Sequence, residues 1–245
     1  MAIEIRAIVD AELDRYMELC QIAFGGKPEE GEADRVREVI GLDRTTAAFD
    51  GPRMVGTAAA YRLHLSVPGT DHTTFRGHEP PGVPTAGLSR VTVAATHRRR
   101  GVLRAMMAAH VDDAAANGEV LSVLWASEFP IYGRFGFGPA SDAYRLRYDN
   151  RLAGIGRPDE LDDLALAEGD EAAELLPPLR EQDRLGRPGH FHRSTTWWTH
   201  RSFPDVEALR DGASPRRTVV ARRDGRPVGY ATYRQAPRWD CLLYT

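Results

Sequence analysis

Cysteine is scarce in this chain, which has only Cys20 and Cys241. They lie far apart and form no CxxC pair, so the sequence predicts neither a disulfide framework nor a thiolate metal site. We expect buried free thiols instead. No carboxylate or cysteine near His190, His192 and His200 completes a tetrahedral set of ligands. No metal is therefore expected.

Long apolar runs are also absent, and none approaches the roughly 20 residues that cross a bilayer. Residues 1–10 alternate charged and apolar types and lack the basic and apolar regions of a secretory signal. We therefore expect a cytosolic protein without a membrane partner. The formal net charge of -3 gives no general attraction to nucleic acid, so that partner is not expected either.

The chain does have ample apolar content, 42% of 245 residues, which is enough for one large domain or two ordinary ones at roughly 150 residues each. The apolar periodicity predicts helices over 11–24 and 99–117, the second with Leu103, Met107 and Val111 on one face and Gly118 at its C-terminal cap. Alternation predicts strands over 3–8 and 144–148, and strand-like runs predict further strands over 45–49, 54–65, 88–94 and 120–126.

The order of these elements predicts the architecture. Asp50-Gly51-Pro52 is a turn signal between two strands and indicates an antiparallel hairpin. Residues 88–126 read as strand, basic turn, helix and strand, a βαβ unit with a parallel pair. The fold class is therefore α/β with a mixed sheet (α+β). A Gly- and Pro-bearing stretch at 153–158 divides the chain into domains 1–152 and 153–245.

The second half contains a faint echo of the first, seen when residues 46–62 are laid beside 218–234. Both segments carry an Asp-Gly turn, a Val-Gly pair and a closing Tyr-Arg. Any hairpin with an Asp-Gly turn gives a similar pattern, so an ordinary hairpin is the alternative. If the echo is a repeat, we expect an incomplete second domain, because the sequence stops before a second βαβ unit.

The run Arg98-Arg99-Arg100-Gly101-Val102-Leu103 lies between a strand and a helix. A diphosphate needs several backbone N–H groups that converge on one point, and a Gly-containing turn that opens a helix supplies them. Gly101 lets the backbone approach the phosphates, and the arginines add charge and forked donors. Alone, the run would favour a solvated basic turn. The strand before it and the helix after it favour the phosphate site.

Arg-x-x-Gly-x-Leu after such a strand resembles the coenzyme A signature of the GNAT acetyltransferase superfamily. Residues 84–88 (PTAGL), 96–106 (THRRRGVLRAM), 126–128 (ASE) and 131–139 (IYGRFGFGP) are similar to the Eis (enhanced intracellular survival) branch. The resemblance implies a GNAT fold with acetyl-CoA as co-substrate, and acetylation of aminoglycoside-like or other small polycationic amines. It also implies homo-oligomers, namely hexamers, and two GNAT-like domains followed by a sterol-carrier-like domain, which this sequence lacks.

The resemblance also assigns roles to residues. Val91, Thr92 and Val93 would line the pantetheine arm, and Ser127 and Glu128 would contact the coenzyme after the next strand. The implied cofactor-binding set is Val91, Thr92, Val93, Arg99, Arg100, Gly101, Val102, Leu103, Arg104, Ser127 and Glu128.

The resemblance also implies that Tyr132 is the catalytic acid. Acetyl transfer needs an acid that protonates the departing thiolate, and a phenol with a pKa of about 10 can do so. Packing beside Phe135 and Phe137 is the alternative role. The resemblance implies that the base is the carboxylate at the end of the third domain. Without that domain, we expect this chain to bind acetyl-CoA better than it turns it over.

Four acidic residues, Glu29, Glu30, Glu32 and Asp34, follow the loop Gly25-Gly26 and could attract a polycationic substrate. A solvated helix face is the alternative interpretation. Two other functions stay open as well. The domain could acetylate protein amines, or the chain could be a non-catalytic module that binds acetyl-CoA.

Overall fold

The computed structural model describes residues 3–26, 31–70, 80–142, 163–207 and 210–236. They fall into two compact units, the first made of 1–140 with 184–201, the second of 141–183 with 202–245. The expected strand at 144–148 and the boundary at 153–158 lie outside the described residues. Segment 184–201 groups with the first unit, although the sequence alone places it in the range of the second domain.

The first unit is built on a mixed sheet with strand order β1-β2-β3-β4-β5. The first four strands pair antiparallel, and β5 pairs parallel to β4. Their bounds are β1 Glu4–Arg6, β2 Thr45–Asp50, β3 Arg53–Leu65, β4 Val83–Val93 and β5 Leu121–Leu124. The mixed sheet, the hairpin and the parallel pair predicted from the sequence are therefore confirmed.

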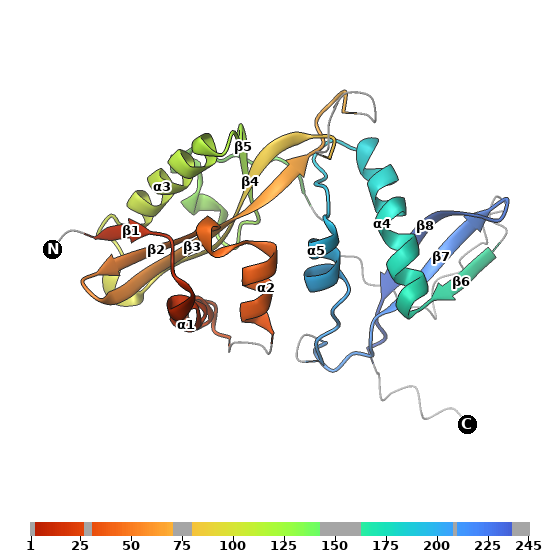
Figure 1. Ribbon diagram of the computed structural model, residues 1–245, viewed down its shortest axis with the longest axis horizontal. Coiled ribbons are helices and arrows are strands. Elements are labelled where there is room, and N and C mark those ends of the chain that lie inside the picture. The colour runs from red at the N-terminus through yellow and green to blue at the C-terminus, as the bar shows by residue number, and fades with distance from the viewer. Residues whose placement is uncertain (1–2, 27–30, 71–79, 143–162, 208–209, 237–245) are drawn as a thin grey trace. The chain divides into compact units, whose positions relative to one another are not determined.

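Helices cover both faces of this sheet. Helices α1 (Leu13–Phe24) and α2 (Glu32–Val39) lie on one face and α3 (Val102–Ala116) on the other, as Figure 1 shows. Each face has its own apolar cluster. Helix α2 was not predicted from the sequence, because Val36 is its only buried residue and gives no apolar period.

Helix α3 is shorter than the predicted 99–117 because its first turn is preceded by left-handed backbone. Arg99 has φ 62° and Gly101, the N-cap residue, has φ 81°. At the other end, the N–H of Gly118 donates to Ala115 O at 3.1 Å, and that of Glu119 donates to Ala114 O at 2.9 Å. These two bonds form a Schellman motif, which confirms the predicted role of Gly118.

The predicted apolar face of α3 was wrong at Val111, which is 54% exposed. The buried side of the helix consists of Val102, Met106, Met107, His110 and Ala114. The helix itself has alanines on every side, so the spacing of its apolar residues does not single out one face.

A buried arginine fixes the position of α3. The guanidinium of Arg44 is 1% exposed, lies 2.5 Å from Asp113 Oδ2 and also pairs with Glu119. A buried charge is tolerated only when it is paired and hydrogen-bonded. Asp113 lies in the last turn of α3, and Glu119 follows directly after the C-terminal cap of that helix. Arg44 directly precedes β2, so this cluster ties the helix to the sheet. Nearby, burial and the Arg44 charge lower the pKa of His110, whose Nε2 lies 2.7 Å from Ser122 Oγ.

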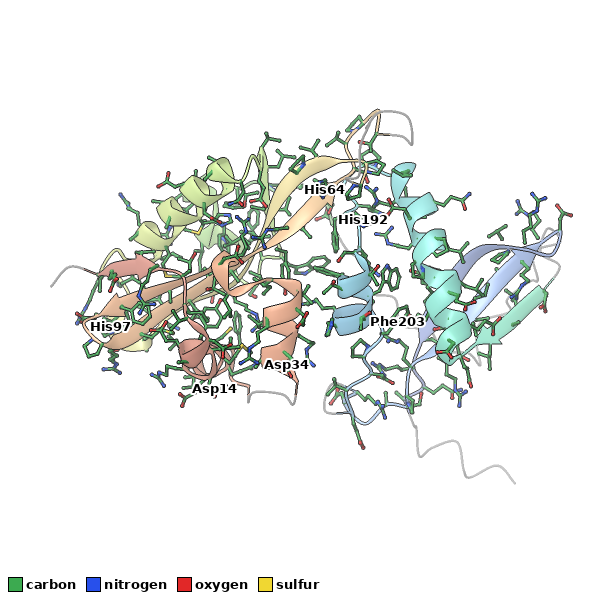
Figure 2. The ribbon with its side chains drawn as sticks, in the orientation of Figure 1. Asp14, Asp34, His64, His97, His192 and Phe203 are labelled. Atoms are coloured by element: carbon green, nitrogen blue, oxygen red, sulfur yellow. The ribbon has the colours of Figure 1, made fainter. Side chains whose placement is uncertain are left out.

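Segment 184–201 is held on the far end of β3. The N–H of Ser66 donates to His190 O at 2.8 Å, and the N–H of His192 donates to His64 O at 2.9 Å. Figure 2 shows His64 and His192 beside each other. Tyr61 stacks edge-on against Trp197 at 5.1 Å between ring centroids. These contacts join two stretches that are separated by more than a hundred residues in the sequence.

The second unit has a three-stranded antiparallel sheet in the order β6-β7-β8. Its elements are β6 (Asp163–Ala167), α4 (Gly169–Leu185), β7 (Arg217–Arg223) and β8 (Arg226–Tyr233). Asp224 and Gly225, both at positive φ, make the turn between β7 and β8. Two central residues with positive φ form a type I′ turn, the usual turn of a two-residue hairpin.

The two hairpins share one register. Ala48 pairs with Gly56 in the first, and Ala221 pairs with Gly229 in the second, with a register shift directly after each alanine. The strand before each hairpin also pairs at the same relative position, Glu4 with Phe49 and Asp163 with Arg222. The echo seen in the sequence is therefore matched by the same bulged geometry in both units.

Gly56→Ala tests the close packing of α3 on the sheet. A Cβ at Gly56 would lie 2.8 Å from the sulfur of Met106 and 3.2 Å from Ala48 Cβ. We expect this overpacking to lower the free energy of unfolding by about 1–3 kcal/mol in urea denaturation. Gly229→Ala is the matched control, because a Cβ there meets nothing within 4 Å. Equal losses for the two variants would contradict this account.

Candidate functional site

A cleft of about 520 Å³ opens at the carboxyl ends of β4 and β5 in the first unit. It is lined by the end of β4, by the loop and first turn of α3, and by the segment that follows β5. Ala23 and Phe24 at the end of α1 also reach it. All of these elements belong to one compact unit, so their arrangement around the cleft is defined.

The cleft exists because β4 and β5 pair over only part of their length. The pairing runs from Thr85 with Leu121 to Leu88 with Leu124, whereas β4 continues to Val93. No described strand pairs with that side of β4 beyond Leu88. Backbone N–H and C=O groups need hydrogen-bond partners. The end of β4 can therefore offer such groups to a ligand.

A bulge bends β4 at the same place. Thr57 pairs with Thr92 and Ala59 with Ser89, so Arg90 and Val91 together oppose Ala58. Side chains stabilise this irregularity. Thr57 Oγ1 donates to Arg90 O at 2.8 Å and lies 2.7 Å from Thr92 Oγ1, and the Tyr16 hydroxyl donates to Ala58 O at 2.7 Å. Bulges bend a strand and aim its side chains, and they are frequent beside active sites.

The basic run forms a turn that leads into α3, as predicted. The first amides of a helix have no acceptor within the helix, so those of Val102, Leu103 and Arg104 are free to bind an anion. A Cβ at Gly101 would meet nothing within 4 Å, which leaves open space over this turn. Arginine side chains surround the same space, namely Arg98, Arg99, Arg104 and Arg134.

His97 anchors this turn to the sheet, and sequence reasoning missed it. The ring is 6% exposed, with Nε2 3.2 Å from Asp50 Oδ2 and Nδ1 2.8 Å from Thr96 Oγ1. Figure 2 shows His97 at the end of the sheet where the β2–β3 hairpin turns. The pairing joins residues 47 positions apart, and no local pattern in the sequence marks it. It holds the start of the arginine turn against the hairpin.

Tyr132 lies in the cleft and also packs against an aromatic neighbour. Its ring meets Phe137 edge-on at 5.9 Å, and it belongs to the apolar contacts below α3. Burial, and then the charge of Glu128, raise the pKa of the Tyr132 phenol above its usual value. The phenol therefore stays protonated at neutral pH. Its hydroxyl has no hydrogen-bond partner among the residues that the structure describes.

The structure brings most of the sequence-predicted residues together. Those that line the cleft are Val91, Thr92, Val93, Arg99, Gly101, Val102, Leu103, Arg104, Glu128 and Tyr132. Arg100 and Ser127 are exposed and are not among the lining residues. Sequence reasoning missed His97, Arg134, Ala23 and Phe24. Ala23 and Phe24 belong to α1, and nothing in the sequence of that helix indicates that it lies near β4.

The acidic cluster is not a single exposed surface. The carboxylate of Glu32 is 12% exposed and pairs with Arg90, and Asp34 pairs with Arg37 on the surface of α2. Glu29 and Glu30 lie outside the described residues. Among the described residues, no group of three or more His, Cys, Asp and Glu side chains could hold a metal ion, and no helix is long and apolar enough to cross a membrane.

A family model described as the acetyltransferase (GNAT) domain matches residues 4–140. This range includes the partly paired strands β4 and β5, the arginine turn and Tyr132. The chain belongs to the GNAT acetyltransferase family. The mixed sheet and the βαβ unit are therefore those of a GNAT fold, as the sequence predicted.

Relatives place this GNAT chain near Eis. An "uncharacterized N-acetyltransferase" of Streptomyces avermitilis is 37% identical over 243 residues, 98% of this chain and 57% of that protein. The N-acetyltransferase Eis of Mycobacterium tuberculosis is 47% identical over 106 residues, 43% of this chain and 24% of that protein. The crystal structure of Eis1 from Mycobacterium abscessus superposes with a TM-score of 0.70 at 29% identity, and covers 95% of this chain and 53% of that one.

These matches confirm the predicted resemblance to the Eis branch. The chain spans about half the length of the curated relatives that it matches.

Gly101→Ala tests the turn before α3. The left-handed φ of 81° disfavours a side chain, and a methyl group there would occupy the open space above the helix N-terminus. We expect the dissociation constant for coenzyme A, measured by titration calorimetry, to rise about tenfold.

Gly118→Ala is the matched control for this variant. Gly118 also has a left-handed φ, 69°, and open space around its Cβ position, but it lies at the opposite end of the same helix. We expect it to lose stability without losing affinity for coenzyme A. Equal affinities for both variants and the unchanged protein would refute the assignment of the turn.

Proposed function

We propose that this chain binds acetyl-coenzyme A in the cleft and transfers the acetyl group directly to an amine of a small polycationic, aminoglycoside-like substrate. One observation carries the first half of the proposal. A free strand edge, a helix N-terminus with its arginines and a protonated phenol line the same cleft. The choice of acceptor rests on the resemblance of residues 84–139 to the Eis branch.

The cleft suits the chemistry of the donor. The diphosphate would lie over Gly101, where the first amides of α3, Arg99 and Arg104 provide donors and positive charge. The pantetheine arm, which carries amide groups of its own, would lie along Val91–Val93, where β4 has no neighbouring strand. This placement directs the thioester toward Tyr132.

Acetyl transfer would make one bond, break another and move two protons. The neutral amine attacks the thioester carbonyl, a C–N bond forms, and the C–S bond breaks. The electron pair leaves on sulfur, and the departing thiolate takes the proton of the Tyr132 hydroxyl. The amine loses its proton to a base or to water, and a proton from solvent restores the Tyr132 hydroxyl. Backbone N–H groups of the β4 bulge would stabilise the oxyanion.

Tyr132→Phe tests the acid. We expect turnover to fall by about 10²-fold, because the phenol donates its proton only in the transition state, while coenzyme A affinity stays the same. Steady-state thiol release and calorimetry measure the two quantities. Tyr233→Phe, a partly exposed tyrosine of β8, is the control and should change neither. Full activity of Tyr132→Phe would remove the assignment.

The pH profile gives an independent test. An alkylammonium with a pKa of about 10 must lose its proton before attack, so the rate should rise with pH up to about 10. Tyr132 acts in its protonated form, and its raised pKa keeps that form present throughout this rise. We therefore expect no decline of the rate below about pH 10. A rate that falls between pH 8 and 9, with the fold intact by circular dichroism, would contradict the role of the phenol.

The acceptor class is tested by titration with acetyl-CoA, followed by thiol release with aminoglycosides, linear polyamines and lysine peptides. Release with the polycationic small molecules supports the proposal. Release with peptides alone would favour protein amines as acceptors, and binding without release would favour a non-catalytic module. Absence of acetyl-CoA binding would remove the proposal altogether.

A further inference from the structure

Arg90 occupies an unusual position in the β4 bulge. It is the only residue of β4 with a left-handed backbone, at φ 55°. A residue with a Cβ is disfavoured in this conformation, and the first position of such a bulge is usually glycine. An arginine here therefore implies that its side chain compensates for the strained backbone.

The Arg90 side chain is buried between the bulge and the helices on that face of the sheet. Nη2 lies 3.1 Å from Glu32 Oε1, with side-chain exposures of 13% for Arg90 and 12% for Glu32. Nη1 lies 3.5 Å from the sulfur of Met17 and 3.9 Å from Cys20 Sγ, both in α1. The guanidinium thus contacts α1 and α2 at once.

Glu32 is held from a second side. Gln21 Nε2 donates to Glu32 Oε2 at 2.6 Å, so the two carboxylate oxygens bind different elements. Glu32 is the first residue of α2, and Gln21 lies in the last turn of α1. The pair of Arg90 and Glu32 therefore connects the bulge to the last turn of α1 and the first turn of α2. Removing the Glu32 carboxylate from such a largely buried pair takes away the charge that compensates the Arg90 guanidinium.

The same bulge faces the cleft on its other side. Val91 follows Arg90 directly and lines the cleft, as do Thr92 and Val93. Ala23 and Phe24, the last two residues of α1, line it as well. A shift of the guanidinium would consequently move two parts of the cleft wall, the end of β4 and the end of α1. The turn before α3 is anchored separately, through His97 and Asp50.

We infer that Arg90 is a positioning residue, whose buried ion pair with Glu32 holds the β4 bulge so that the backbone of Val91–Val93 meets the acetyl thioester. This inference rests on the proposed function, because it assumes that the acetyl end of the donor lies along β4. Loss of the pair should affect recognition of the acetyl group and leave recognition of the diphosphate intact.

The test compares affinities for acetyl-coenzyme A and coenzyme A by calorimetry, since the two ligands differ only in the acetyl group. Arg90→Gly permits the left-handed backbone but removes the anchor, and Glu32→Gln keeps Arg90 and removes its charged partner. Arg37→Ala is the control, because Arg37 lies on the same helix as Glu32 and forms exposed ion pairs with Asp34 and with Asp10.

The unchanged protein should bind acetyl-coenzyme A more tightly than coenzyme A. Arg90→Gly and Glu32→Gln should bind coenzyme A within about twofold of the unchanged protein, while their preference for the acetylated form falls by about fivefold or more. Arg37→Ala should keep both values.

Three results would overturn the inference. The first is a preference retained by either Arg90→Gly or Glu32→Gln, and the second is no preference in the unchanged protein. The third is an equal loss of affinity for both ligands, which marks a purely structural role. Failure of the unchanged protein to bind either ligand would instead overturn the proposed function, so the two failures are distinguishable.

Discussion

The parting of β4 from β5 is the constraint on which the site depends. Parallel strands that stay paired satisfy each other's backbone and leave no room between them. Here the pairing stops at Leu88 and Leu124, and the bulge at Arg90 and Val91 bends β4 immediately afterwards. The unpaired edge is both a cost, because its polar groups need partners, and an opportunity, because a ligand rich in amides can supply them.

The parts around this opening are held by polar contacts between distant segments. Arg44 fixes the end of α3, His97 fixes the arginine turn, and Thr57 stabilises the bulge. Each is buried, and each bonds to a group far away in the sequence. Buried hydrogen bonds and ion pairs of this kind specify one arrangement more sharply than apolar packing does. These contacts hold the helix, the turn and the bulge that border the cleft.

Local signals in the sequence predicted much of this fold. The Asp-Gly turns, the strand-like runs of β2 and β3 and the glycine-bearing basic turn each report a short-range backbone requirement, and the structure confirms those elements. The features that were missed depend on long-range contacts. Helix α2 has too few apolar residues for a period, Arg90 looks like an ordinary strand residue, and His97 gains its meaning only from Asp50. A pattern within one segment carries no information on such partners.

Segment 184–201 gives the first unit an unusual order of assembly. Its hydrogen bonds to His64 and Ser66 and the stacking of Trp197 on Tyr61 belong to the first unit, but the chain passes through residues 141–183 before it supplies them. Domains fold as units during synthesis, starting from the N-terminus. A ribosome that has released only residues 1–140 has therefore not yet delivered every part of this unit. The end of β3 stays uncovered by this segment until residue 201 emerges.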